Sequence, residues 1–208
     1  KKMIDIANKK SSKYKNIKFY NNSIFDFKTK KKFDLISANG FIEYLSLVDF
    51  SKFLKLSNKL IFKKGYLILS SRNRLYNAAS LNQFTLKEIE TKHFKEIIEE
   101  TIHLKNLSFE KFKRIKKRKI KEINFKQPKT GIDVDVRHQY TPNQLINFLA
   151  KYDFVVKEIF PINLHVYGKS IIEKNNTYKF DIKKNLKSEI YKSLIPYAST
   201  FMIVAKKK

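Results

Sequence analysis

The alternation of apolar and polar residues is most regular between residues 33 and 73. Residues 33–38 are almost all apolar, which is typical of a strand buried in a parallel sheet, and residues 66–70 form a second apolar run after a Lys-Lys-Gly turn. Between them, apolar residues recur at helical spacing from position 50 to position 61. The pattern predicts a strand–helix–strand unit in which Asn39 and Gly40 follow the first strand. Ligands of open α/β sheets bind at such carboxyl ends of strands.

Weaker patterns predict elements on both sides of this unit. Apolar residues every three or four positions predict helices, and short alternating or continuous apolar runs predict strands. Thr141 followed by Pro142 is a typical helix start, and Thr85 with Glu88 three residues later fits a capping box. The further helices are expected at residues 3–7, 85–104 and 109–123, after Thr141 and at residues 184–194, and the further strands at residues 17–20, 154–159 and 200–205.

Together these elements predict one α/β domain over residues 1–208, with a mostly parallel sheet and helices on both faces. A chain of 208 residues with 42% hydrophobic residues is large enough to bury one core. Residues 73–137 contain about two helices more than a simple alternation of one strand and one helix would need. We expect this segment to be a helical insertion that would cap a substrate.

The composition excludes several classes of protein. The chain has no cysteine, which rules out disulfides, thiolate metal sites and cysteine nucleophiles and is compatible with the cytoplasm. No apolar run approaches 18 residues, so we expect no transmembrane helix. The start, KKMIDIANKK, is basic but has no apolar segment of the kind found in secretory signals.

The formal net charge of +26 has two interpretations. It could form a basic surface for nucleic acid or anionic membranes. It could instead reflect a composition rich in Lys, Asn, Ile, Phe and Tyr, as AT-rich codons would produce, and this is the interpretation that we favour. Lys far outnumbers Arg, although Arg is the better bidentate ligand of phosphate. We therefore expect the basic helix at residues 109–123 to bind RNA only weakly and in a strongly salt-dependent manner.

Several motifs resemble the class I S-adenosylmethionine (SAM) dependent methyltransferases. In that family a strand of the form FD followed by two hydrophobic residues ends beside the methionine part of the cofactor, as in FDLISANG at residues 33–40. A KKGG turn introduces the next strand, where this chain has one glycine, Gly65. The segment HQYTPNQL at residues 138–145 is similar to the TP-x-x-L helix before the sixth strand of the family. The resemblance covers most of the chain and is strongest to members that act on small molecules and on sugar or lipid intermediates.

The resemblance begins at the helix after the second strand of the family. The family's Gly-rich loop and the acidic residue that holds the ribose hydroxyls have no counterpart here, and the chain opens with Lys1. We therefore expect an N-terminally truncated Rossmann-like domain, with the first two strands missing and the insertion placed after the fifth family strand. In the family strand order 3-2-1-4-5-7-6, residues 17–20 would be strand three and residues 33–38 strand four. Strand three would then have no native partner and strand four would have an open apolar edge, unless residues 17–20 slid in to pair with it non-natively. The chain alone should bind SAM negligibly and be marginally folded.

The resemblance assigns two groups of residues to the cofactor. The family has a Gly-Asp pair after its third strand that contacts the adenine amino group, and this chain has an uncharged pair there. The next residue would pack on the adenine ring, and the residues after the fourth strand would line the methionine part. The family often has Glu-His in the following helix, where this chain has Glu43-Tyr44. The assigned cofactor residues are Asn22, Ser23, Ile24, Asn39, Gly40 and Phe41. Turn formation alone would also explain Asn22-Ser23 and Asn39-Gly40.

The function implied is transfer of a methyl group from SAM to an oxygen or nitrogen of a small-molecule, sugar or lipid acceptor. Enzymes accelerate such a displacement largely by alignment, so few catalytic side chains are needed. His138 is a weak candidate for a general base, although a lone histidine is more often structural. No histidine or carboxylate spacing predicts a metal site. The alternative is a non-catalytic basic module for RNA or anionic surfaces on a degenerate methyltransferase scaffold.

Overall fold

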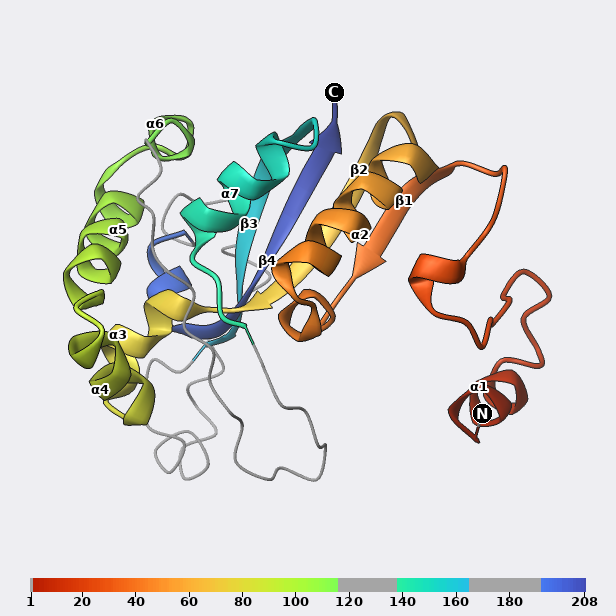
Figure 1. Cartoon of the computed structure of the whole chain (residues 1–208), viewed down its shortest axis with the longest axis horizontal. Helices are drawn as coiled ribbons and strands as arrows, with labels where there is room; N and C mark the ends of the chain where they lie inside the picture. Colours follow the sequence, from red (N-terminus) through yellow and green to blue (C-terminus); the bar gives the residue numbers. More distant parts are fainter. Residues whose placement is uncertain (1, 116–137, 165–191) are drawn as a thin grey trace.

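The computed structural model describes residues 2–115, 138–164 and 192–208 (Figure 1). These residues form an α/β fold with a four-stranded sheet of order β1-β2-β4-β3. The strands are β1 (Phe33–Ala38), β2 (Ile61–Arg72), β3 (Phe154–Leu164) and β4 (Ala198–Lys207). This order matches the 4-5-7-6 half of the Rossmann-like methyltransferase sheet, so the expected fold class is confirmed.

Three of the four described strands run in the same direction. Strands β1 and β2 pair in parallel, and β4 runs antiparallel to both β2 and β3, so β3 points the same way as β1 and β2. The expected mostly parallel direction of the strands is therefore confirmed, with β4 as the reversed strand. The apolar runs did not show which strand would be reversed, because a strand covered by helices is similarly apolar in either direction.

The core lies between this sheet and two helices on one of its faces (Figure 1), and it extends to residues 97–112 of the segment that follows β2. Helix α2 (Leu47–Leu60) crosses from β1 to β2, and α7 (Pro142–Ala150) packs on β3. The two helices meet through the stacked rings of Phe50 and Phe148, whose centroids are 5.1 Å apart. Thr141 caps α7 as predicted, in a capping box completed by Gln144. Apolar side chains spaced at the helical period fill this layer.

The segment after β2 contains more helices than the sequence predicted. It forms η3 (Arg74–Tyr76), α3 (Asn77–Ser80), α4 (Gln83–Glu90), α5 (Phe94–Asn106) and α6 (Phe109–Lys113). The single helix expected at residues 85–104 is wrong, because the chain breaks at Lys92, whose φ is 60°. The expected capping box is also wrong. Thr85 is the third helical residue of a box that begins at Asn82, and Glu88 is buried in an ion pair. Residues 116–123 of the expected basic helix and most of the helix expected at 184–194 lie outside the described residues.

The N-terminal region lies to one side of the sheet (Figure 1). It contains α1 (Lys2–Lys10), which buries no residue, and η1 (Ile24–Asp26), which packs against α2. The strand expected at residues 17–20 is wrong, because these residues have no regular structure and pair with no described strand. Strand β1 is therefore the edge of the described sheet, and it is not buried as expected: Leu35 is 49% exposed. An alternating pattern becomes a strand only where a neighbouring strand supplies hydrogen bonds.

Strand β2 begins five residues earlier than predicted and contains the Lys-Lys-Gly turn as an irregularity. The register with β1 jumps from Phe33↔Ile61 to Leu35↔Tyr66. Lys64 adopts a left-handed conformation with φ of 71°, and Gly65 lies tightly against β1. A Cβ atom on Gly65 would lie 2.9 Å from the carbonyl oxygen of Asp34 and 2.6 Å from Cγ2 of Ile61. The turn thus requires glycine because of a close approach between strands.

We expect Gly65→Ala to lower the free energy of unfolding by about 1–3 kcal/mol, the usual cost of overpacking a tight site. Urea unfolding followed by circular dichroism measures this. The matched control is Lys64→Gly, which should leave stability unchanged or raise it, because glycine adopts a positive φ without a steric penalty. Equal midpoints for Gly65→Ala and the unmodified chain would contradict the close approach.

Candidate functional site

The carboxyl ends of β1 and β2 lie side by side, because the two strands are parallel and Ala38 pairs with Leu69. The turn after β1 is tied to β2 by a hydrogen bond of 2.7 Å from the Gly40 N–H to the Ser70 hydroxyl oxygen. Gly40 has φ of 59°, and a Cβ atom added to it would meet no atom within 4 Å. The turn therefore presents an open backbone surface at the end of the sheet where ligands of α/β proteins bind.

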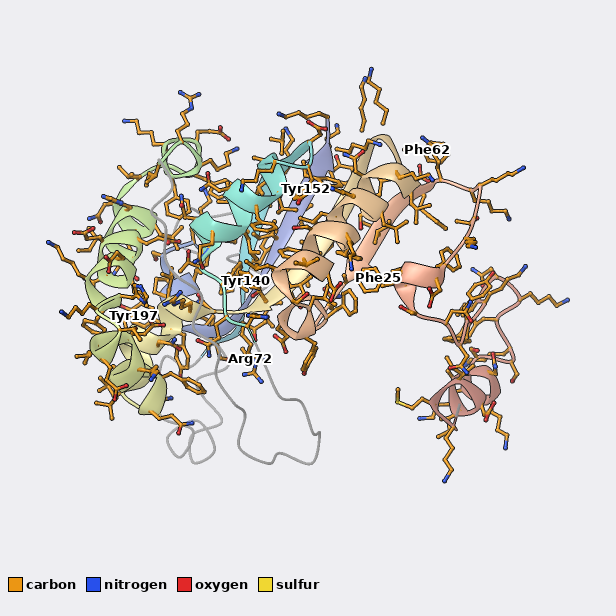
Figure 2. All side chains as sticks on the ribbon, viewed as in Figure 1. Phe25, Phe62, Arg72, Tyr140, Tyr152 and Tyr197 are labelled. Carbon is orange, nitrogen blue, oxygen red and sulfur yellow. The ribbon has the colours of Figure 1, made fainter. Side chains whose placement is uncertain are left out.

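Two charged residues, Glu43 and Arg72, lie next to this turn at the same end of the sheet. Glu43, in η2 (Ile42–Tyr44), is buried, and its Oε2 accepts a hydrogen bond of 3.3 Å from the backbone N–H of Arg72. The Arg72 Nε lies 4.0 Å from Glu43 Oε1, and the Arg72 side chain is 38% exposed. Figure 2 shows Arg72 at this end of the sheet. The backbone carbonyl of Glu43 accepts a hydrogen bond of 2.7 Å from the His138 N–H. The arrangement fixes one partly exposed cation beside the open turn.

Residues 138–140 lie alongside the end of β2. The Tyr140 N–H donates to the carbonyl of Arg72 (3.2 Å), and the Arg74 N–H donates to the carbonyl of Tyr140 (3.0 Å). The side-chain amide of Asn73 donates to the carbonyl oxygens of Ile195 (2.7 Å) and Ala198 (2.8 Å). We call residues 70–74 the polar end of β2. This short segment makes hydrogen bonds to the turn after β1, to residues 138–140 and to residues 195–198, which are far apart in the sequence.

The most deeply buried part of this cluster is an ion pair. Arg74 and Glu88 are joined by two hydrogen bonds of 2.8 Å, and their side chains are 1% and 0% exposed. The amide of Asn77 donates to Glu88 Oε1 (2.9 Å) and to Gln139 Oε1 (2.7 Å). Helix α4 is thereby attached to the polar end of β2 through charged and amide groups. Such a bidentate pair holds its members in a single relative orientation.

Glu100, on α5, is a buried acid that contacts the start of α7. Burial raises the pKa of its carboxyl to about 7, and hydrogen bonds from the Thr141 side chain and the Asn143 N–H oppose this rise. The bond from Asn143 to Glu100 Oε1 is 2.8 Å long. The protonated form of Glu100 is therefore favoured in the folded protein up to about neutral pH.

The predicted cofactor residues lie in two places. Asn39 and Gly40 are exposed after β1, where the Asn39 amide donates to Ser37 (3.2 Å), and the Phe41 ring packs edge-on against Phe53. The other group is in and before η1. There Ser23 caps η1 by accepting the Phe25 N–H, Ile24 is partly buried against the core and Asn22 is exposed. The structure thus places the first group at the carboxyl end of the sheet and the second beside α2, and their roles in binding remain predictions.

His138 is only 7% exposed, which favours a structural role over that of a general base. The sequence reasoning missed Glu43, Ser70, Arg72, Asn73 and Arg74 as organising residues. For all of these residues except Glu43, the sequence does contain a signal. It is the polar run SSRNR at residues 70–74, which directly follows the apolar part of β2 at the same edge as Asn39 and Gly40. Within residues 2–115, 138–164 and 192–208, no group of three His, Cys, Asp or Glu side chains could hold a metal ion. No helix in these same ranges is long and apolar enough to cross a membrane.

We expect Glu88→Gln to lower the free energy of unfolding by about 3–5 kcal/mol, because it leaves the charge of Arg74 buried without its counter-ion. Urea unfolding measures the loss. The control is Glu90→Gln on the same helix, whose exposed pair with Lys87 should be worth about 1 kcal/mol or less. A loss at Glu88 as small as that at Glu90 would contradict a structural role for the buried pair.

The raised pKa of Glu100 predicts a specific pH dependence. Because the folded-state pKa is about 7 and the ordinary value is 4.5, the stability that Glu100 contributes is fully present below pH 4.5. It is lost as pH rises through about 7, by about 3 kcal/mol at 1.36 kcal/mol per pKa unit. Thermal unfolding of the unmodified chain and of Glu100→Gln at several pH values between 4.5 and 8 tests this. The difference between the two should change across this window, and a constant difference would contradict the assignment.

Comparisons with known proteins support the fold through structure alone. No family model matches the sequence, and no curated protein matches it. A SAM-dependent methyltransferase from Mesorhizobium loti aligns over 97% of this chain and 75% of its own, with a TM-score of 0.51 and 11% identity. One from Clostridium acetobutylicum aligns over 100% of this chain and 72% of its own, with a TM-score of 0.51 and 11% identity.

PKMT2 from Rickettsia typhi, in a structure with AdoHcy, also aligns over the whole of this chain. It does so with a TM-score of 0.51 and 14% identity, and this chain spans 42% of its length. Identities this low show similarity of fold and not of substrate. Taken with the strand order β1-β2-β4-β3 and the helices α2 and α7, these alignments show that the chain has the fold of the class I SAM-dependent methyltransferases.

Proposed function

We propose that this chain takes part in the transfer of a methyl group from SAM to an oxygen or nitrogen of a small-molecule, sugar or lipid acceptor. The observation that carries the proposal is the open turn at Gly40. It lies at the carboxyl end of two parallel strands in a fold shared with SAM-dependent methyltransferases. Because no atom lies within 4 Å of the position of a Gly40 Cβ, the backbone there leaves room for a ligand.

The chain offers groups for each part of the cofactor. Asn39, Gly40 and Phe41 would line the methionine part, beside the Ser70 hydroxyl that holds Gly40 in place. Ile24 would pack on the adenine. Ser23 would replace the acid of the family, because its hydroxyl oxygen keeps a second lone pair that can accept from the adenine amino group after it accepts the Phe25 N–H. An uncharged group should hold adenine less tightly than a carboxylate does.

Bound SAM would supply a methyl group on a positively charged sulfur. The role of the chain is then to hold the acceptor oxygen or nitrogen in line with that methyl group. Among the residues that the structure describes, Arg72 is a charged side chain well placed to orient an acceptor, because it is partly exposed and lies next to the buried Glu43. His138 could receive the acceptor proton only from a group that reaches its largely buried ring. Water is the simpler proton acceptor at this edge.

The proposal predicts weak but localised binding of the product S-adenosylhomocysteine. At micromolar concentrations we expect no binding. At millimolar concentrations, amide signals of residues 22–24 and 39–41 should shift in NMR spectra of the ¹⁵N-labelled chain. Gly40→Asn should weaken these shifts strongly, because its side chain fills the open space while Asn tolerates a positive φ. The matched control, Leu81→Asn, changes a residue with φ of 48° that is 82% exposed, and should bind normally.

Two outcomes would contradict the proposal. One is the absence of shifts at millimolar ligand, and the other is a set of shifts that persists in Gly40→Asn. The alternative, a basic binding module, is favoured by the net charge of +26. It predicts instead that a single-stranded RNA oligomer binds tightly above physiological salt. Binding that rests on counterion release alone would collapse under that condition.

A further inference from the structure

Arg72 lies at the end of an interior strand. Strand β2 pairs with β1 on one side and with β4 on the other, and the ladder to β4 continues as far as Arg72, which lies opposite Thr200. Side chains two positions apart on a strand share a face, so Arg72 and Ser70 lie on the same face of the sheet. The Ser70 hydroxyl accepts the Gly40 N–H (2.7 Å). Arg72 is therefore directed to the side of the sheet on which the open turn is held.

The backbone of Arg72 is fixed by groups from three directions. Its N–H donates to Glu43 Oε2 (3.3 Å), and its carbonyl oxygen accepts from the Tyr140 N–H (3.2 Å) and from the Ser71 hydroxyl (2.9 Å). Glu43, Tyr140 and Ser71 are all buried. The side chain of Arg72 therefore extends from a rigid base, and a ligand that binds it does not have to order the backbone first.

The guanidinium of Arg72 keeps its hydrogen-bond donors available. Its Nε lies 4.0 Å from Glu43 Oε1, which is beyond hydrogen-bond distance, and the side chain is 38% exposed. Within residues 2–115, 138–164 and 192–208, this guanidinium donates no hydrogen bond. Arg74, two residues further on, differs in both respects: it donates two bonds of 2.8 Å to Glu88 and is 1% exposed. Arg74 thus binds a group of the protein, whereas Arg72 has donors left for a ligand.

The chemistry of these donors selects an anionic ligand group. A guanidinium matches the oxygens of a carboxylate or a phosphate through two parallel hydrogen bonds, and such charge-assisted bonds are stronger than neutral ones. Among the described residues, Glu43 is the one carboxylate within 4.0 Å of the Arg72 guanidinium, and its Oε2 is already engaged by the Arg72 backbone. The net charge of +26 adds a favourable field for an anion.

The place of Arg72 along β2 favours the acceptor over the cofactor as the source of this anion. The methionine part of the cofactor is assigned to residues 39–41, and Ser70 is the residue of β2 that contacts this turn. Arg72 lies two residues further along, roughly 7 Å at the rise of a strand. There it adjoins Tyr140 and precedes the helices that follow β2. It therefore lies between the turn and the segment that we expect to cap a substrate.

We propose that Arg72 binds an anionic group, a carboxylate or a phosphate, of the methyl acceptor. The guanidinium would donate two hydrogen bonds to that group, while the charge of Glu43 keeps the guanidinium in place. This inference rests on the proposed methyl transfer and narrows its acceptors to molecules that carry an acidic group. Arg72 takes no part in the chemical step and acts by fixing the orientation of the acceptor.

The test is an NMR titration of the ¹⁵N-labelled full chain with inorganic phosphate and, separately, with acetate. It is done in about 0.15 M NaCl, where exposed charges are largely screened. The Arg72 Nε–H signal and the amide signals of residues 43 and 72 should shift and saturate at millimolar anion. Arg72→Gln should weaken binding at these amides by about tenfold or more, because the charge-assisted hydrogen bonds are lost. Arg72→Lys should restore only part of it, because Lys keeps the charge without the planar fork.

The matched control is Arg114→Gln, at an exposed arginine that ends α6, which should bind both anions as the unmodified chain does. Shifts of residues 43 and 72 that persist in Arg72→Gln, or that never saturate, would overturn the inference, because they would reflect the basic surface in general. Competition of phosphate with S-adenosylhomocysteine, but not with methylthioadenosine, would also overturn it. Methylthioadenosine lacks the carboxylate, so that result would assign Arg72 to the cofactor.

The same titrations separate this inference from the proposed function. Shifts at residues 39–41 with S-adenosylhomocysteine, without any response of Arg72 to either anion, would overturn the inference and leave the proposed function intact. Saturable phosphate binding at Arg72 without shifts from S-adenosylhomocysteine would contradict the proposed function. The assignment of the anion to a methyl acceptor would then fail with it.

Discussion

The polar end of β2 is the constraint on which the described structure depends. Buried polar groups need partners, and those in this segment find them in different parts of the chain. Ser70 holds the turn after β1, the backbone of Arg72 holds Glu43, and Asn73 holds the start of β4. Arg74 binds Glu88 on α4. One short segment thus sets the positions of the turn, of residues 138–140 and of the helices that follow β2.

The sequence predicted the elements whose signals are local. Residues 33–38 are all in β1, and Thr141-Pro142 starts α7 with the expected cap, because an apolar run and a capping residue act within a few positions. The helix break at Lys92 was not predictable, since the apolar period continues across it. The false strand at residues 17–20 failed because strand formation depends on a neighbour that the pattern does not contain. The reversed direction of β4 was not readable for a similar reason, because it depends on the strands beside it.

The candidate site was predictable only in part. Asn39 and Gly40 followed from their place after an apolar strand, and the structure shows Gly40 with an open side. The buried charges were not found, because Glu43, Arg74 and Glu88 resemble solvent-exposed residues in a chain with 45 Lys and Arg. Tertiary contacts alone decide that these charges are buried. The open edge of β1, in contrast, follows from the strand order of the family, and the exposed Leu35 agrees with it.

In the proposed function, the turn after β1 forms one wall of a site for SAM. Photolabelling of the chain with SAM that carries a radioactive methyl group tests this most directly, because ultraviolet light captures weak binding that equilibrium methods miss. After digestion, we expect label in peptides that contain residues 39–41 or 22–24, and competition by unlabelled S-adenosylhomocysteine. Label spread over the lysine-rich peptides, or label that the competitor does not reduce, would contradict it.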